Sequence, residues 1–179
     1  FEEQIGRVGG NDWRLVGGHR VWYAPEDPVT SYIPDNDAVD VEVISSDEIC
    51  FKVSLIPEVE KSLIMRVATN ANEFEILNQI RNTSDQVLRT ASWGITTFAP
   101  GGVGYMPISK AISPSDTLSA SGQINLWDYT LFSDPAFTWR SEWIEFHQER
   151  TLSKQKVGTY LRNPWLAYRL GESLVIKTF

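Results

Sequence analysis

The sequence has very little cysteine and histidine with which to cross-link a fold or hold a metal ion. Cys50 is the only cysteine among 179 residues, which excludes an intrachain disulfide and any metal site with several cysteine ligands. The two histidines, His19 and His147, lie too far apart in the chain to form a zinc-binding motif. We therefore expect neither a metal ion nor a cofactor.

Basic residues and long hydrophobic runs are also scarce. The 16 lysines and arginines are outnumbered by 23 acidic residues, and the resulting net charge of −7 repels nucleic-acid phosphates and anionic membranes. The apolar runs are far shorter than the ~20 residues that a membrane-spanning helix requires. We expect no nucleic-acid and no membrane partner. The compartment stays open, with the periplasm or the extracellular space slightly favoured over the cytoplasm.

Alternation of apolar and polar side chains with a period of two dominates from residue 39 onward. This period places alternate side chains on opposite faces of a strand, and we find no helical or βαβ pattern. Turn-forming residues such as Pro57 separate the runs, and strands at intervals of roughly 8–12 residues are typical of an all-β sandwich or barrel. We expect strands over residues 49–56, 63–68, 74–80, 87–98, 123–131, 143–148, 157–161, 165–169 and 174–179.

The two ends of the sequence indicate that it is part of a longer protein. Phe1 is not an initiator methionine, and the residues after it lack the layout of a signal peptide. At the other end, the strand-like run up to Phe179 stops without a polar tail. We expect residues 1–179 to be a single domain and a fragment of a longer protein, with the remainder of that chain as one partner.

Residues 17–37 are unlike the rest of the chain because they combine polar, aromatic and proline residues within a short segment. The prolines at 25, 28 and 34 predict a fixed irregular loop that presents its side chains. Its aromatic rings could stack on a sugar, and its polar groups could bind hydroxyls or a carboxylate. The candidate residues are His19 and Glu26 as an acid–base pair, and Arg20, Trp22, Tyr32 and Asp35 as substrate-binding residues.

The same segment also fits a purely structural interpretation, which stays open. It describes a packed crossover loop with Trp22 in the core and Arg20 paired with Glu26. By strand parity His147 shares a face with Glu145 and Glu149, and it is expected at the surface.

Several short motifs occur in an order that resembles a known family. The most specific combines Gly17-Gly18-His19-Arg20 with Trp22 and Ala24-Pro25-Glu26. The others, individually weaker, are Pro34-Asp35-Asn36-Asp37, Trp93-Gly94-Ile95-Thr96, Ala99-Pro100-Gly101-Gly102, Leu126-Trp127-Asp128-Tyr129, Asp134-Pro135, Lys156-Val157-Gly158, Trp165-Leu166-Ala167-Tyr168 and Lys177-Thr178-Phe179. Over nearly the whole chain they resemble an uncharacterised bacterial family with a galactose-mutarotase-like fold.

The resemblance implies a large antiparallel β-supersandwich, of which this chain is a partial domain, with a concave sheet face that binds sugars. The superfamily includes aldose 1-epimerases, in which a histidine serves the ring oxygen and a carboxylate takes the anomeric proton. Here the strand similar to the mutarotase histidine strand carries Trp93, a further stacking residue, and no histidine. The strand that bears the glutamate base corresponds to sequence beyond Phe179.

The leading hypothesis is a carbohydrate-binding protein, acting as an aldose 1-epimerase-like isomerase at a sugar anomeric carbon if it is an enzyme. Its partner would be a mono- or oligosaccharide. Alternatives are a non-catalytic carbohydrate-recognition domain of a glycan-degrading system, and a structural domain whose aromatic residues form the core. A polysaccharide-lyase-related domain is a further alternative, in which Arg20 or Lys156 neutralises a uronate and Tyr32 acts as the base.

Overall fold

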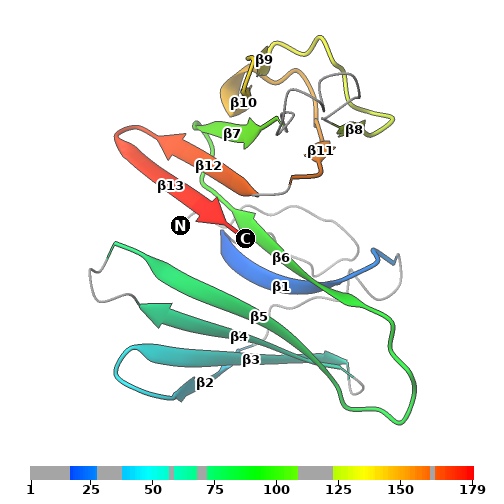
Figure 1. Cartoon of the computed structure of the whole chain (residues 1–179), viewed down its shortest axis with the longest axis vertical. Coiled ribbons are helices and arrows are strands. Elements are labelled where there is room, and N and C mark those ends of the chain that lie inside the picture. The colour runs from blue at the N-terminus through cyan, green and yellow to red at the C-terminus, as the bar shows by residue number, and fades with distance from the viewer. Residues whose placement is uncertain (1–16, 28–37, 57–58, 68–71, 109–122, 162–163) are drawn as a thin grey trace, which may run out of the picture. The chain divides into compact units, whose positions relative to one another are not determined.

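The computed structural model of the chain describes residues 17–27, 38–56, 59–67, 72–108, 123–161 and 164–179 (Figure 1). These residues form thirteen β-strands that pair in antiparallel sheets, and the helical structure among them is a single 3-10 turn, η2 (Gln148–Arg150). The prediction of an all-β, antiparallel protein is confirmed. The chain divides into two compact units, Phe1–Thr97 and Phe98–Phe179, which we describe separately. The single domain over residues 1–179 stays a prediction.

The first unit contains a four-stranded sheet with amphipathic character. Its strands lie in the order β2 (Asp40–Val43), β3 (Glu48–Ile56), β4 (Val59–Val67) and β5 (Phe74–Asn82). One face carries ion pairs between neighbouring strands, such as Lys52 with Glu42 at 2.7 Å and Arg66 with Glu48 at 2.6 Å. By alternation, the opposite face carries most of the apolar side chains of β4 and β5. The hairpin expected after Ile56 is present.

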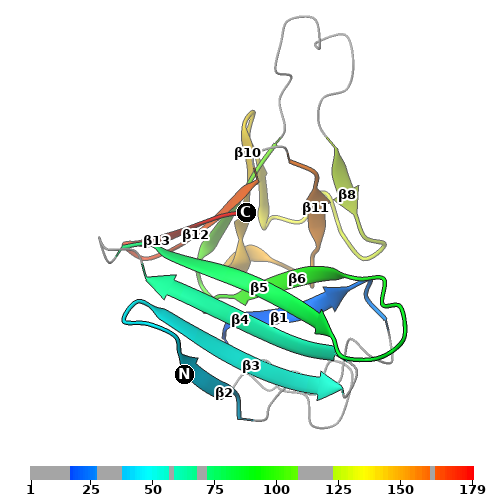
Figure 2. The same cartoon turned by 60° about the horizontal axis from the view of Figure 1, so that its bottom comes forward.

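A second layer of the first unit is formed by β1 (Gly18–Ala24) and β6 (Ala91–Thr97), which contact β4 and β5 (Figure 2). The prediction that residues 17–37 begin as an irregular loop is wrong for residues 18–24. The first proline of the segment is Pro25, one residue after β1 ends, so nothing prevents the β-branched and aromatic residues before it from pairing with β6.

Several predicted strands are longer than the observed ones, and two of them differ the most. The strand expected over residues 87–98 begins only at Ala91, and Val87 is 98% exposed. The strand expected over residues 123–131 ends at Leu126, because the amide of Thr130 donates to the carbonyl of Trp127 at 2.8 Å and closes a turn. In both segments the alternating pattern continues into residues that have no partner strand among the described residues.

The second unit is built on a five-stranded sheet. Its order is β13 (Ser173–Thr178), β12 (Trp165–Leu170), β7 (Val103–Pro107), β10 (Trp143–His147) and β9 (Phe137–Trp139). One face packs the core around Ile144, which is 2% exposed, and the ring of Phe137 contacts that of Phe146. Because side chains alternate along β10, the neighbours of Ile144 project from the other face, which is polar.

A separate two-stranded sheet of the second unit pairs β8 (Ile124–Leu126) with β11 (Val157–Thr159). A buried carboxylate, that of Asp134, organises the loops around it. Its two oxygens accept hydrogen bonds from the amides of Ala136 and Leu152 and from the side chain of Gln155. Gln155 in turn accepts from the amide of Leu131 at 2.7 Å, which ties the segment after β8 to the segment before β11.

Candidate functional site

His19, the predicted catalytic acid, lies near the start of β1 and connects the two layers of the first unit. Its Nδ1 is 2.8 Å from Oγ1 of Thr96 in β6, and its Nε2 is 3.0 Å from Oδ1 of Asn78 in β5. An amide oxygen can only accept, so Nε2 donates, and in the neutral ring Nδ1 accepts from the threonine hydroxyl. Both ring nitrogens therefore hold β1 against its neighbours.

Glu26, the predicted base, is exposed and lies beyond the other end of β1. His19 and Ala24 are separated by about 17 Å of extended strand at the usual rise per residue. The structure thus puts His19 and Glu26 at opposite ends of the strand and does not bring them together as an acid–base pair.

Trp22 and Trp93 are brought together. They are directly opposite in the pairing of β1 with β6, and their rings meet edge to face with centroids 5.5 Å apart. Trp22 is 8% exposed, so it packs as a core residue instead of offering a free face. Arg20 shares the strand face of Trp22 by alternation. Of the other predicted residues, Tyr32 and Asp35 lie outside the described residues.

The second unit contains a polar cluster that sequence reasoning did not assemble. It lies on the polar face of the five-stranded sheet, and we call it the Glu145 cluster. In the strand register, Tyr105 of β7 is opposite Glu145 of β10, and Val103 is opposite both His147 of β10 and Arg169 of β12. The cluster consists of Tyr105, Arg140, Trp143, Glu145, His147 and Arg169.

Glu145 accepts hydrogen bonds from three side chains. Nε of Arg140 and Nε1 of Trp143 lie 3.0 and 3.2 Å from its Oε1, and Nε2 of His147 lies 3.2 Å from its Oε2. The bond from Arg140 is the largest cause that lowers the pKa of Glu145 to about 2, and the bonds from Trp143 and His147 add to it against the opposing effect of burial. Glu145 is therefore ionised at neutral pH.

The cluster combines groups that can accept and donate protons. With Nε2 of His147 directed at the Glu145 carboxylate, Nδ1 is the nitrogen left to accept a proton, and it makes no hydrogen bond within the described part of the chain. Nε of Arg169 donates to the hydroxyl of Tyr105 at 3.3 Å, which leaves the phenol proton free to be donated. A carboxylate that orients a histidine in this way is a recurring element of acid–base sites.

Strand parity correctly put Glu145 and His147 on one face, but its extension to Glu149 is wrong, because β10 ends at His147 and Glu149 lies in η2. The sequence held no signal for the rest of the cluster. Tyr105 and Arg169 come from strands that are distant in the chain, and only the register of β7, β10 and β12 makes them neighbours.

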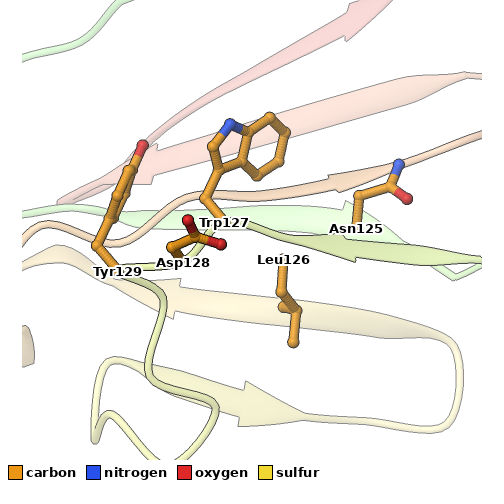
Figure 3. A pocket seen from close by; sticks show the side chains of 5 residues that line it. All are labelled: Asn125, Leu126, Trp127, Asp128 and Tyr129. Carbon is orange, nitrogen blue, oxygen red and sulfur yellow. The ribbon is translucent and has the colours of Figure 1, made fainter.

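A third candidate is a surface pocket of about 260 Å³ at the end of β8, which we call the Trp127 pocket. It is lined by Asn125, Leu126, Trp127, Asp128 and Tyr129. Figure 3 shows the rings of Trp127 and Tyr129 on the same side of the backbone, with the Asp128 carboxylate between them and Leu126 pointing the other way. Trp127 is 38% exposed and Tyr129 is 40% exposed, so both rings can be reached from solvent.

Two lysines cover these rings. Nζ of Lys156 lies 4.2 Å from the centre of the Trp127 ring, and Nζ of Lys154 lies 4.8 Å from that of Tyr129. Both distances are within the range of cation–π attraction. Lys156 was predicted to bind substrate, and it belongs to the second unit, as the Trp127 pocket does.

The turn that presents the pocket is held to β11 through Thr130. Its hydroxyl donates to the carbonyl of Lys156 at 2.6 Å and accepts from the amide of Trp127 at 3.3 Å. Gly158 allows the close approach, because a Cβ at this position would lie 3.3 Å from the Trp127 ring. The motifs Leu126-Trp127-Asp128-Tyr129 and Lys156-Val157-Gly158, noted separately in the sequence, thus form one surface.

No known protein family, curated protein or solved structure matches this chain. In the part of the chain that the structure describes, no helix has the length and hydrophobicity needed to cross a membrane. Within the same residues, no three histidine, cysteine, aspartate or glutamate side chains are grouped to hold a metal ion. The strands and their pairing show an all-β protein with antiparallel sheets, and a function has to be argued from the chemistry of its own side chains.

Proposed function

We propose that this protein binds carbohydrate and that the Trp127 pocket is the binding site. The observation that carries the proposal is the pair of solvent-accessible aromatic rings, Trp127 and Tyr129, on one side of a turn with the Asp128 carboxylate between them. Aromatic rings stack on the C–H faces of a pyranose, and carboxylate and amide groups bind its hydroxyls. The pocket offers both within five consecutive residues.

The resemblance of the sequence to a galactose-mutarotase-like family supports the same ligand class, and an antiparallel all-β architecture is compatible with it. The proposal moves the site from the N-terminal segment to the second unit. Two observations support this change: Trp22 is buried against Trp93, and both nitrogens of His19 are engaged in hydrogen bonds. Lys156, one of the predicted substrate-binding residues, lies at the new site.

The test is a titration of the chain with a panel of aldoses and uronic acids, in which binding is monitored by the NMR line widths of the sugar resonances. Trp127→Ala is expected to abolish the broadening, because it removes the larger stacking face. The control is Tyr160→Ala, which removes an aromatic ring that is 74% exposed and does not line the pocket. If no sugar resonance broadens, or if the broadening is unchanged in Trp127→Ala, the pocket is not a sugar site.

A second candidate function is aldose 1-epimerase-like catalysis, and one observation favours it. Nδ1 of His147 is available as a base while Glu145 holds the ring from the other side. In the proposed reaction, His147 takes the proton of the anomeric hydroxyl and Tyr105 protonates the ring oxygen. The bond between the anomeric carbon and the ring oxygen then breaks and leaves an open-chain aldehyde. When the chain recloses on either face, Tyr105 takes back a proton from the attacking hydroxyl and His147 returns its proton to the anomeric oxygen, so both groups are regenerated.

Exchange spectroscopy on the same samples tests this chemistry, because it measures interconversion of the α and β anomers separately from binding. An epimerase must accelerate the exchange, and His147→Gln must remove the acceleration while the fold is kept. Binding without acceleration would favour the alternative of a carbohydrate-recognition domain without catalysis.

A further inference from the structure

We infer that the Trp127 pocket selects acidic sugars, with the carboxylate of a uronic acid held by Lys154 and Lys156. This inference rests on the proposed function, because it names the class of sugar that the proposed site would take. The chain is acidic overall, with a net charge of −7, yet two positively charged groups, the ammonium groups of Lys154 and Lys156, lie over the rings of the pocket.

The ammonium groups are positioned but not neutralised. Neither Lys154 nor Lys156 forms an ion pair with a carboxylate within the described residues. Each lies over a ring face, and an ammonium group in this position still has N–H donors directed away from the ring. An anionic oxygen arriving from solvent would gain charge-assisted hydrogen bonds without first having to break an ion pair.

The backbone of Lys156 is held by Thr130, which sets the point from which the lysine side chain reaches the Trp127 ring. Its carbonyl accepts from the Thr130 hydroxyl at 2.6 Å, and its amide donates to the same oxygen at 3.4 Å. The Thr130 hydroxyl also accepts a hydrogen bond from the amide of Trp127, so the backbones of Lys156 and Trp127 are both bonded to one side chain. A preorganised group loses less conformational entropy on binding than a freely moving one.

The lysines also argue against a neutral sugar as the preferred ligand. The Lys156 ammonium covers one part of the Trp127 ring, and a neutral pyranose that stacks there has to displace it without offering a counter-charge. A uronate has a C–H face for the rings and a carboxylate for the ammonium groups. Asp128 lies between the rings in Figure 3, where its carboxylate can accept hydrogen bonds from the hydroxyl groups of the sugar.

The experiment compares two trisaccharides of equal length, galacturonic acid trimer and galactose trimer, by isothermal titration calorimetry near neutral pH. We expect the acidic trimer to bind about tenfold more tightly at low ionic strength, and the difference to shrink when salt is raised, because partly exposed charges are screened. In Lys154→Gln/Lys156→Gln the preference should disappear, while the neutral trimer binds no worse than before.

The matched control is Lys52→Gln/Arg150→Gln, which removes the same net charge at two exposed residues that do not line the pocket and should keep the preference. Equal affinity for both trimers in the wild-type chain, with both lost in Trp127→Ala, would overturn the inference and leave the proposed function standing. Failure of both trimers to bind would overturn both. Acetate or inorganic phosphate competing as well as the acidic trimer would reduce the pocket to a general anion site and also overturn the inference.

Discussion

The hydroxyl of Tyr168 in β12 accepts a hydrogen bond from the backbone amide of Gly102 at 2.9 Å and donates one to the carbonyl of Ala99 at 2.5 Å. The ring of Tyr168 also stacks on that of Phe98, with centroids 4.6 Å apart. These contacts fix the segment that leads into β7, the strand that carries Tyr105. One side chain thus connects the turn before β7 to the neighbouring strand and helps to set the position of the Glu145 cluster.

Gly102→Ala is expected to destabilise the second unit by about 1–3 kcal/mol, the usual range for overpacking. An added Cβ would lie 2.4 Å from the Tyr168 ring and 2.6 Å from the backbone oxygen of Arg169, which cannot move independently of β12. Chemical denaturation measures the loss. The control is Gly104→Ala in β7, whose Cβ would meet Phe146 at an ordinary 3.8 Å. Equal stability of the two variants would contradict the packing described here.

Glu145→Gln is expected to lower stability near neutral pH by about 1–3 kcal/mol, the range for hydrogen bonds to a charged group. The pKa of Glu145 is lowered from 4.5 to about 2 in the folded chain, mainly by Arg140. The stabilisation is therefore complete above about pH 4.5 and is lost as the pH falls through about 2. Denaturation of both chains at several pH values should show their difference shrinking over this window. The control is Glu172→Gln, at an exposed turn. A stability difference between Glu145→Gln and the wild-type chain that does not change with pH would refute the lowered pKa of Glu145.

Asp134→Asn is expected to destabilise the second unit by about 1–3 kcal/mol and to weaken sugar binding. Asparagine has one accepting oxygen and one NH2 group, so it cannot replace both carboxylate oxygens. Oδ1 of the aspartate accepts from the Ala136 amide at 2.9 Å, and Oδ2 accepts from the Leu152 amide and the Gln155 side chain at 3.2 and 2.8 Å. Because Gln155 precedes Lys156, the pocket loses part of its support. Unfolding and calorimetric titration give the two readouts, and the exposed Glu149→Gln should change neither. Full sugar affinity in Asp134→Asn would show that this aspartate does not support the pocket.

His19→Ala is expected to cost about 1–3 kcal/mol of stability and to leave sugar affinity unchanged in the fraction that is folded. The physical reason is the loss of the hydrogen bonds to Thr96 and Asn78 between the layers of the first unit. His147→Ala should instead remove the acceleration of anomeric exchange and have less effect on stability. Abolition of binding by His19→Ala, measured well below its unfolding transition, would restore the N-terminal site that the sequence analysis predicted.

Several features could be predicted from the sequence because their cause is local. Alternation in residues 49–56 and 74–80 is sufficient to specify strands, and β3 and β5 occupy those positions. Parity alone put His147 beside Glu145, since side chains two apart on a strand share a face. The structural interpretation of Trp22 was also available from its sequence context, and its burial agrees with it.

The same local reasoning failed where pairing partners decide the outcome. Residues 87–90 alternate like a strand but have no partner in the described part of the chain, whereas residues 18–24, next to a proline-rich stretch, form β1 because β6 lies beside them. A strand is completed by hydrogen bonds to another strand, so its extent depends on residues elsewhere in the chain.

The all-β class, the acidic net charge and the faces on which most strand residues lie follow from composition and a period of two, so they could be predicted from the sequence. Which side chains meet depends on how the strands are arranged in space. Lys156 over Trp127, His19 against Asn78, and Tyr105 opposite Glu145 each join segments that are distant in the chain. Such contacts depend on strand order and register, in which a shift of one residue would turn every side chain to the other face.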